Sequence, residues 1–282
     1  MIVEEALSRA TRRLAEAGVE TARLDARLLL ASVDGMSASA VLLDPDRELA
    51  AGVESAFDRL VDRRVRREPV SRILGRREFW SLDFAISLAT LDPRPDSETL
   101  VEAALAQFEP EPSRRVLDLG TGTGCLLLSV LSERPKWVGL GIDIAEEAVA
   151  VARANARTLE LSERAHFQTG DWDKGLAGNF DLIVSNPPYI PSSEIAGLSP
   201  EVASFDPLRA LDGGTDGLDA YRALAPALLR LLAPQGRVVI ELGKGQVAAI
   251  AGIMEAAGLR ALERRQDLAG VERCLVLGNP VP

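Results

Sequence analysis

Residues 115–125 read RVLDLGTGTGC, a short apolar run that leads directly into a glycine-rich turn. Similar apolar runs recur downstream, separated by segments with the apolar spacing of helices. We expect strands at 115–119, 138–143, 165–169, 180–185 and 237–241, and helices at 124–133, 146–159, 218–232 and 246–257. Short strands that are almost entirely apolar are typical of a parallel sheet covered by helices on both faces. The sequence therefore predicts an α/β fold with a doubly wound, mostly parallel sheet, completed by an antiparallel pair around 259–265 and 273–278.

The first 75 residues have a different pattern, which predicts a small helical bundle. Apolar residues recur at helical spacing from Leu7 to Ala17, and again in a longer fourth helix that ends before Pro69. A second helix capped by Thr21 and a third at 37–43 are expected between these two. Residues 76–91 then alternate between apolar and polar, as a β-hairpin does. We therefore predict a helical domain at 1–75, a β-hairpin linker at 76–91 and the α/β domain at 92–282.

The composition is that of a globular protein, since 47% of the 282 residues are apolar. No run of about 18 apolar residues is present, and the acidic N-terminus MIVEE is unlike a signal peptide, so we expect a cytoplasmic protein without membrane contact. The wide separation of Cys125 and Cys274 favours buried free thiols over a disulfide or a metal site. Because His166 is the only histidine, the chain has little scope for a histidine-based triad or zinc site, and we expect no metal.

The net charge of −10 argues against direct nucleic-acid binding, because such a surface is repelled by a phosphate backbone. Positive charge does gather between Arg59 and Arg77. Two interpretations are open. The arginines form a solvated helix face neutralised by Asp58, Asp62 and Glu68, or they form a docking surface for an acidic protein partner.

The turn after the first predicted strand is the candidate cofactor site. It consists of Gly120, Thr121, Gly122, Thr123 and Gly124. Glycines let a ligand approach the backbone closely, and Asp143, at the end of the second strand, can accept hydrogen bonds from both hydroxyls of a ribose. A nicotinamide dinucleotide requires GxGxxG, and both registers fail because Cys125 or Leu127 occupies the third glycine position. A GxGxG turn followed by an acid favours S-adenosylmethionine, which has no pyrophosphate.

Two residues after the third predicted strand lie at the same edge of the sheet. Trp172 offers a face on which adenine can stack, and Asp171 can accept a hydrogen bond from the adenine amino group. We therefore include both in the cofactor site.

The tetrapeptide Asn186-Pro187-Pro188-Tyr189 follows the fourth strand, opposite the glycine turn. Ligands of such sheets bind outside the carboxyl ends of the strands. Neither proline has an N–H, so the local backbone presents acceptors only. The Asn186 side-chain oxygen and the Pro187 carbonyl could each accept one N–H of an incoming NH2, while Tyr189 would wall the slot and pack on the planar group. We therefore predict Asn186, Pro187 and Tyr189 as catalytic residues, with Pro188 completing the acceptor site and Asn186 also bordering the cofactor.

This arrangement suits the methylation of an amide or amidine nitrogen. An amide nitrogen is a poor nucleophile, because its lone pair is delocalised into the carbonyl group. Two acceptors that hold both hydrogens would orient the nitrogen and ease the build-up of positive charge on it, so positioning and electrostatics carry the reaction. A carboxylate has no hydrogens to donate and would be rejected.

Taken together, these segments resemble the protein-(glutamine-N5) methyltransferases that act on peptide-chain release factors. The resemblance rests on DLGTGTG at 118–124, GID at 141–143 and NPPYI at 186–190. It extends to PVSRILG at 69–75 followed by Glu78-Phe79, PRPDSE at 93–98, and ALDGGTDGL at 210–218 followed by Tyr221-Arg222. It implies a class I S-adenosylmethionine-dependent, Rossmann-like domain, with a helical domain that docks the substrate.

The resemblance also implies that Asn186 to Tyr189 hold the glutamine of a Gly-Gly-Gln motif, and that Gly120 to Gly124, Asp143 and Trp172 contact or border the cofactor. Two positions depart from the family pattern. Asp92 stands where an aliphatic residue is usual, and Asp206-Pro207 stands where Glu-Pro is commoner.

Other readings of the same motifs remain open. A ribosomal-protein glutamine is one alternative substrate, and adenine N6 in nucleic acid is another, although the acidic chain with 4% aromatic residues disfavours the latter. A non-catalytic S-adenosylmethionine-binding protein is a third, which the complete acceptor site disfavours. The long stretch at 191–215 has little regular patterning, and we expect it to border the substrate groove.

Overall fold

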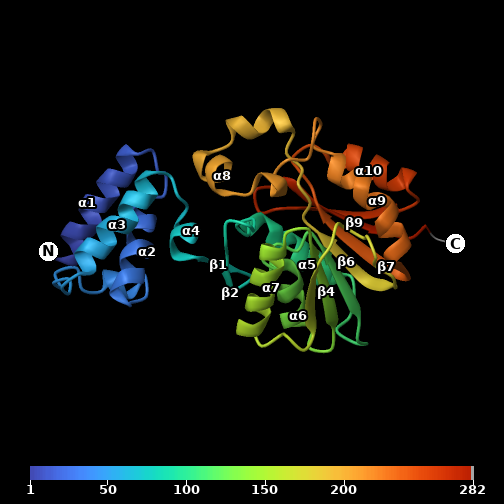
Figure 1. The fold of residues 1–282 in the computed structure, drawn as a ribbon, viewed down its shortest axis with the longest axis horizontal. Helices are drawn as coiled ribbons and strands as arrows, with labels where there is room; N and C mark the ends of the chain where they lie inside the picture. The colour runs from blue at the N-terminus through green and yellow to red at the C-terminus, as the bar shows by residue number, and fades with distance from the viewer. Residues whose placement is uncertain (281–282) are drawn as a thin grey trace. The chain divides into compact units, whose positions relative to one another are not determined.

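The computed structural model describes residues 1–280. Contacts divide the chain into two compact units. The first consists of Met1–Arg76 together with the short segment Ser199–Phe205, and the second consists of Arg77–Leu198 and the residues from Asp206 onward (Figure 1).

A seven-stranded sheet forms the centre of the second unit, with the strand order β5-β4-β3-β6-β7-β9-β8. Its strands are β3 (Arg115–Leu119), β4 (Val138–Asp143), β5 (Ala165–Thr169), β6 (Phe180–Ser185), β7 (Leu232–Glu241), β8 (Arg260–Gln266) and β9 (Glu272–Gly278). The first five are parallel, while β9 pairs antiparallel with both β7 and β8. The predicted doubly wound, mostly parallel sheet and its antiparallel closing pair are confirmed.

Helices cover both faces of this sheet, and Figure 1 shows them on either side of the strands. They are α5 (Glu98–Ala106), α6 (Cys125–Glu133), α7 (Glu146–Thr158), α9 (Asp219–Leu231) and α10 (Val247–Ala256). Because side chains alternate across a strand, successive residues pack into different cores. Val116 packs with the residues of α5, α6 and α7, whereas Leu117 packs with those of α9 and α10. Two apolar layers therefore enclose the sheet.

The parallel register brings the carboxyl ends of β3, β4 and β6 to one edge. Leu119 lies beside Ile142 of β4 and beside Ser185 of β6. The Ser185 hydroxyl donates a hydrogen bond to the Leu119 carbonyl at 2.7 Å, which joins the two strand ends. The glycine turn, Asp143 and Asn186 all follow directly from these positions.

A short hairpin, β1 (Arg76–Phe79) and β2 (Leu82–Ala85), precedes the sheet in the chain. Its two turn residues, Trp80 and Ser81, both have positive φ, at 54° and 57°. Two such residues in a two-residue turn match the backbone twist of a hairpin, although bulky side chains are uncommon there. The Trp80 backbone N–H donates to the Glu98 carboxylate at 2.8 Å, which anchors the turn.

The first unit is helical and has its own apolar core. Its elements are α1 (Val3–Glu16), α2 (Ala22–Asp34), the 3-10 helix η1 (Ala40–Leu42), α3 (Val53–Val65), α4 (Val70–Leu74) and α8 (Pro200–Phe205). Leu14, Leu29 and Phe57 are completely buried between the longer helices.

Several arginines of the basic stretch between Arg59 and Arg77 form ion pairs. Arg63 pairs with Glu68, and the buried Arg64 pairs with Asp25 at 2.7 Å. Arg64 and Arg67 also bind Glu201 of α8, at 3.0 and 2.7 Å. Burial alone would raise the pKa of Glu201, but hydrogen bonds from Arg67 and Arg64 lower it to about 2. Of the three acids expected to neutralise the stretch, Glu68 does so, whereas Asp58 and Asp62 pair with Arg9 and Arg13 of α1.

Two local expectations were wrong. The helix predicted at 37–43 is only the 3-10 turn Ala40–Leu42. The Ser37 hydroxyl accepts the Ala40 N–H at 3.1 Å, as a helix cap does, but Pro45 disfavours a helical Asp44 and so keeps the turn from lengthening. The strand expected at 237–241 begins at Leu232, ahead of a register shift. The stretch at 191–215, for which no element was predicted, contains the short helical turns η3 (Ser192–Gly197), α8 and η4 (Leu208–Ala210).

Within residues 1–280, no helix has the length and apolar character needed to cross a membrane.

Candidate active site

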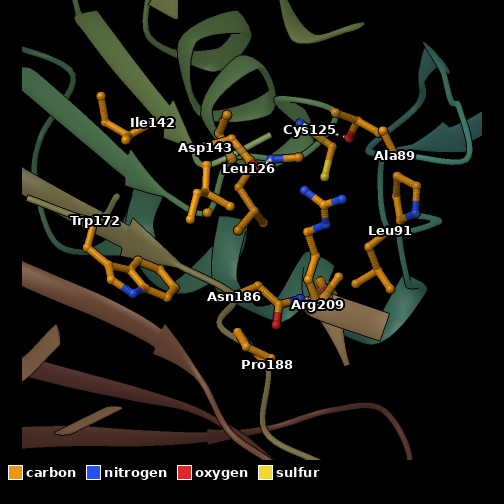
Figure 2. A pocket seen from close by; sticks show the side chains of 18 of the residues that line it. Ala89, Leu91, Cys125, Leu126, Ile142, Asp143, Trp172, Asn186, Pro188 and Arg209 are labelled. Atoms are coloured by element: carbon orange, nitrogen blue, oxygen red, sulfur yellow. Dashed lines mark hydrogen bonds between the residues drawn. The ribbon is translucent and has the colours of Figure 1, made fainter. Parts of the chain in front are cut away.

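A cavity of about 290 Å³ opens at the carboxyl edge of the parallel strands. In Figure 2, Asn186 and Pro188 lie on one side of it and Asp143 and Leu126 on the other. A volume of this size is near the lower end of the range for small-molecule sites. The cavity therefore lies where the sheet topology places a ligand.

Most of the predicted site residues line this one cavity. They are Gly120, Thr121, Gly122, Thr123, Asp143, Asp171, Trp172, Asn186 and Pro188. Three others do not: Gly124 begins α6 behind the turn, Pro187 is buried, and the Tyr189 hydroxyl lies against Glu241. The glycine turn and the Asn186 tetrapeptide thus meet at a single site, although Tyr189 does not wall it in this structure.

The glycine turn is shaped by close contact with its surroundings. Gly120 has a φ of 75°, and a Cβ atom there would lie 3.5 Å from the ring of Trp172. Gly120 and Thr121 both donate their backbone N–H to the Ile142 carbonyl, at 2.9 and 2.8 Å. A residue with a side chain at position 120 would be strained and would fill the space beside the indole ring.

Asp143 is held rigidly by backbone donors on both sides. Its Oδ2 accepts the Gly122 N–H at 2.8 Å, and its Oδ1 accepts the Ala145 N–H at 2.9 Å. Each carboxylate oxygen has a further lone pair, so both can accept from neighbouring hydroxyl groups. Asp143 is therefore preorganised to bind a diol at the cavity.

Asp118 is a buried carboxyl group behind the same turn, and it was not predicted as a site residue. Its side chain is 1% exposed, and Thr121 donates a hydrogen bond to its Oδ2 at 2.6 Å. Oδ1 has no hydrogen-bond partner among residues 1–280. Burial raises the pKa of Asp118 to about 7, with the Thr121 bond acting in the opposite direction. A nearby cation would relieve this cost.

Trp172 has a φ of 51°, in the left-handed region that a bulky residue rarely occupies. Such strain is often found where a side chain is held in place for function. Its indole lines the cavity beside Gly120. The neighbouring Asp171 carboxylate pairs with Lys174, which lies outside the cavity lining.

Asn186 is fixed by a side chain from a distant part of the sequence. Its Nδ2 donates to the Ser97 hydroxyl oxygen at 3.2 Å, and Ser97 in turn donates to Glu241 Oε2 at 2.5 Å. Asn186 Oδ1 accepts no hydrogen bond from the described part of the chain. The side-chain oxygen is therefore available as an acceptor at the cavity.

Glu241 is the buried acid at the end of β7. It is 1% exposed, and burial raises its pKa to about 7, although hydrogen bonds from Ser97 and Tyr189 and the charge of Arg273 act to lower it. The Tyr221 hydroxyl donates to the Glu241 backbone carbonyl at 2.9 Å. Burial also raises the pKa of Tyr189, whose hydroxyl donates to Glu241 Oε1 at 3.4 Å and stays protonated.

Sequence reasoning missed several cavity residues. Ser97 and Arg94 come from the PRPDSE segment, and Arg209 comes from the stretch at 191–215. In Figure 2 the Arg209 side chain extends into the cavity toward Cys125. An acid at the carboxyl end of a predicted strand was the available signal for Glu241. Both cysteines are free, as expected.

The two positions that depart from the family pattern are neighbours in space. The Asp92 backbone N–H donates to Asp206 Oδ1 at 3.4 Å, and Arg94 pairs with the same Asp206 carboxylate. Asp206 therefore connects Asp92 to Arg94, which lines the cavity.

The residues at the cavity fit a nucleoside that carries positive charge. Asp143 provides rigid acceptors for ribose hydroxyls, Trp172 a stacking face, and Gly120 a backbone that a ligand can approach. Asp118 lies behind the turn and does not line the cavity, but positive charge on a ligand nearby would favour its ionised form. S-Adenosylmethionine, with its ribose, adenine, ammonium and sulfonium groups, matches this set.

Two family models match the chain. One is described as the PrmC N-terminal domain and matches residues 5–75, and the other is described as the Methyltransferase small domain and matches residues 88–197. Curated relatives named Release factor glutamine methyltransferase match almost the whole chain. The Rhodospirillum rubrum protein is 55% identical over 276 residues, 98% of this chain and 85% of that protein. The Caulobacter vibrioides protein is 45% identical over 272 residues, covering 95% and 94% of the two chains.

Solved structures share the fold of the second unit at much lower identity. The hMettl16 catalytic domain in complex with the MAT2A 3′UTR hairpin 6 has a TM-score of 0.56 at 16% identity, covering 72% of this chain and 79% of that one. A methyltransferase from Pyrococcus furiosus has a TM-score of 0.53 at 19% identity, covering 71% and 90%. At these identities the likeness concerns the fold alone.

Proposed function

The chain belongs to the release factor glutamine methyltransferase family, and on that premise we propose that it methylates the side-chain amide nitrogen of the glutamine in a release factor's Gly-Gly-Gln motif. Its methyl donor is S-adenosylmethionine. We expect the reaction to take place in the cytoplasm and to support translation termination.

One observation carries this proposal. Asn186, an amide acceptor with a free side-chain oxygen, faces the same cavity as the glycine turn and the rigid carboxylate of Asp143. A hydrogen-bond acceptor for an N–H group and a site for a nucleoside-type methyl donor therefore lie in one cavity. This juxtaposition supports methyl transfer to an NH2 group.

On the cofactor side, the residues of this chain would bind and orient the methyl donor. S-Adenosylmethionine supplies an electrophilic methyl group attached to a sulfonium. Asp143 would accept hydrogen bonds from the ribose, Trp172 would pack on the adenine, and the turn at Gly120 would admit the ligand close to the backbone. The apolar walls formed by Leu126, Ile142 and similar residues exclude water, which strengthens each of these interactions.

The acceptor half would work by orientation. Asn186 Oδ1 would accept one N–H of the glutamine amide, and the Pro187 carbonyl would accept the other. Methylation leaves positive charge on the nitrogen until one proton is lost, and two oxygen dipoles directed at it stabilise that charge. The burial of Pro187 fixes the backbone that carries this carbonyl. Because both groups are acceptors, a glutamate in place of the glutamine would be rejected.

The test is a transfer assay with labelled S-adenosylmethionine and purified substrates. We expect label in an unmodified release factor and none in a matched release factor whose Gly-Gly-Gln glutamine is replaced by glutamate. Ribosomal protein and DNA serve as the competing substrates. Label that appears in either of these, but not in the release factor, would overturn the proposal.

We further propose that the helical unit docks the release factor through a groove of about 630 Å³. The groove is lined by Glu4, Leu7, Ser8, Thr11, Arg12, Arg23, Leu24, Arg27 and Leu42. Leu24 and Leu42 are 42% and 44% exposed and offer apolar contact to a ligand of the groove. Arg12 and Arg23 have no ion-pair partner among residues 1–280. An acidic segment of the release factor with apolar side chains would complement both features.

A further inference from the structure

Ser97 lies where the 3-10 helix η2 (Pro95–Ser97) runs directly into α5, and its own backbone is helical, with φ −70° and ψ −11°. A capping serine has an extended backbone and accepts an N–H of the first helical turn. The Ser97 hydroxyl makes no such bond. The side chain is 2% exposed and instead joins Glu241 at 2.5 Å and Asn186 at 3.2 Å. The hydroxyl is thus used for contacts with Glu241 and Asn186, and not for capping α5.

The single proton of this hydroxyl decides the orientation of Asn186. Ser97 donates that proton to the Glu241 carboxylate, which has no proton of its own to give when ionised. Toward Asn186 the hydroxyl can then only accept. Asn186 must therefore turn its NH2 toward Ser97, and this leaves Oδ1 on the opposite side of the amide group. The reverse amide orientation would place two acceptors in contact and leave a buried group unsatisfied.

We propose that Ser97 and Glu241 are positioning residues that set which end of the Asn186 amide meets the substrate. The inference rests on the proposed function, because only an acceptor that must receive an N–H needs this polarity. With Asn186 reversed, its NH2 would face the NH2 of the glutamine, and the two donors would repel each other. Glu241 and Ser97 therefore select an amide donor through Asn186, without touching the substrate themselves.

The register of the sheet makes this chain possible. Ile240 of β7 lies beside Ser185 of β6, so Glu241 and Asn186 leave neighbouring strands at the same level. Ser97 reaches both from the start of α5.

The charges around Glu241 tune its protonation. Arg273 attracts the ionised form, while Asp96, which pairs with Arg273 at 3.4 Å, opposes it. Tyr189 and Tyr221 approach from the other elements, and both remain protonated donors. Because burial dominates, the pKa of Glu241 is raised to about 7. Protonated Glu241 can donate to Ser97, which frees the Ser97 proton for Asn186 Oδ1 and removes the preference between the two amide orientations.

The experiment compares Glu241→Gln and Ser97→Ala with the wild-type protein in the release-factor assay across pH 5.5 to 8.5, a range chosen to bracket about pH 7. Glutamine keeps the shape of the side chain but can donate as well as accept, so it relaxes the polarity without opening a cavity. We expect kcat of both variants to fall about 10- to 100-fold at pH 8, with the Kd for S-adenosylmethionine within about twofold of the wild-type value. We expect the wild-type kcat to decline below about pH 7, and this acidic limb to disappear in Glu241→Gln.

Ser129→Ala is the matched control. Ser129 is also completely buried, but its hydroxyl has no hydrogen-bond partner among residues 1–280, so its loss should leave kcat unchanged. A Glu241→Gln variant with kcat within twofold of the wild type, or with an intact acidic limb, overturns the positioning role. A parallel loss of cofactor affinity and kcat also overturns it, because that pattern indicates general damage. A wild-type protein that labels no release factor would instead refute the proposed function.

Discussion

Ser185 of β6 and Ile240 of β7 lie side by side in parallel register, and the next residue of each strand is a polar group of the site. The first is followed by Asn186 and the second by Glu241. Two side chains far apart in sequence are thus brought to one edge by backbone pairing alone. The acceptor group and the acid that orders its surroundings are consequences of the same strand register.

Replacing Asn186 by Ala should separate binding of the cofactor from catalysis. The change removes the side-chain oxygen proposed to hold the substrate, while Asp143, Trp172 and the glycine turn stay intact. We expect kcat to fall about 100-fold or more, the scale seen when one preorganised polar group is lost. The Kd for S-adenosylmethionine, measured by calorimetry, should change by only a few-fold. Near-normal turnover in this variant would contradict the acceptor role.

Replacing Gly141 by Ala should destabilise the protein and weaken the cofactor site. A Cβ atom at this position would lie 2.5 Å from Phe167 and 2.8 Å from the Thr121 hydroxyl, far inside contact distance. Overpacking of this kind costs about 1 to 3 kcal/mol of unfolding free energy. Displacement of Thr121 should also raise the Kd for S-adenosylmethionine. Urea unfolding and calorimetry measure the two effects.

Gly252 provides the control for this change. It lies inside α10, and a Cβ atom there meets nothing within 4 Å. Gly252→Ala should therefore stabilise the protein by about 0.5 to 1 kcal/mol, because alanine loses less conformational entropy in a helix. If both substitutions change the unfolding free energy equally, the close contacts at Gly141 do not determine stability there.

The pH dependence of stability should be set by Asp118 and Glu241 in the range from about pH 5 to 8. Burial raises the pKa of each to about 7, whereas unfolded carboxyl groups titrate near pH 4. Within this window the folded state binds more protons than the unfolded state, so the unfolding free energy rises as the pH falls. Each group should add about 2 kcal/mol between pH 8 and pH 5.5.

Urea titrations of the ligand-free protein at the two pH values measure this effect. Asp118→Asn and Glu241→Gln should each remove about half of the pH dependence. Carboxylates with lowered pKa, such as those of Glu201 and Asp267, lose their contribution only at more acidic pH and do not reverse the trend. A stability that increases steadily from pH 5.5 to 8 would contradict the assignment.

Removing the Glu201 carboxylate should loosen the helical unit. Glu201→Ala leaves Arg67 without the partner that it binds through two nitrogens, at 2.7 and 2.8 Å, and deprives Arg64 of one of its two acids. We expect a loss of about 2 kcal/mol, since hydrogen bonds between charged groups contribute on this scale. Faster hydrogen exchange in α3 would locate the effect. Glu16→Ala, at an exposed position of α1, should leave exchange unchanged.

Charge reversal in the groove of the helical unit should weaken substrate binding alone. Arg12→Glu with Arg23→Glu should raise KM for the release factor about fivefold to tenfold, because two favourable charge interactions become repulsive. The value of kcat and the Kd for S-adenosylmethionine should stay within about twofold. Arg59→Glu, an exposed arginine of α3 outside the groove, is the matched control. Unchanged KM in the double variant would refute the docking proposal.

The sequence predicts the sheet well, because apolar strands have clear limits. The bounds of β4, β5 and β6 agree with the expected residues, since each run ends at a polar or turn residue. The start of β7 could not be predicted, because Pro234 and Gly236 read as a turn although both lie within the strand. Short turns such as η3 and α8 carry too few apolar residues to display a helical period.

Some residues of the site could be predicted from the sequence and others could not. Motifs that are contiguous in sequence, such as the glycine turn and Asn186 with its prolines, could be predicted from residue types. Ser97 could not, because its local position predicts a helix cap and only the three-dimensional structure directs its hydroxyl to Glu241. Arg209 belongs to a segment without periodicity, so nothing in its neighbours predicts that it lines the cavity.

The inclusion of Ser199–Phe205 in the helical unit makes that unit discontinuous along the chain. No single cut of the polypeptide can release it whole. A fragment that ends at Arg76 would lack Glu201 and leave the guanidinium groups of Arg64 and Arg67 without that anion, whereas a fragment that begins at Arg77 would expose an orphaned acid. To isolate the helical unit, α8 must be joined by a linker to the end of the fragment 1–76. To isolate the second unit, the segment Ser199–Phe205 must be replaced by a short loop.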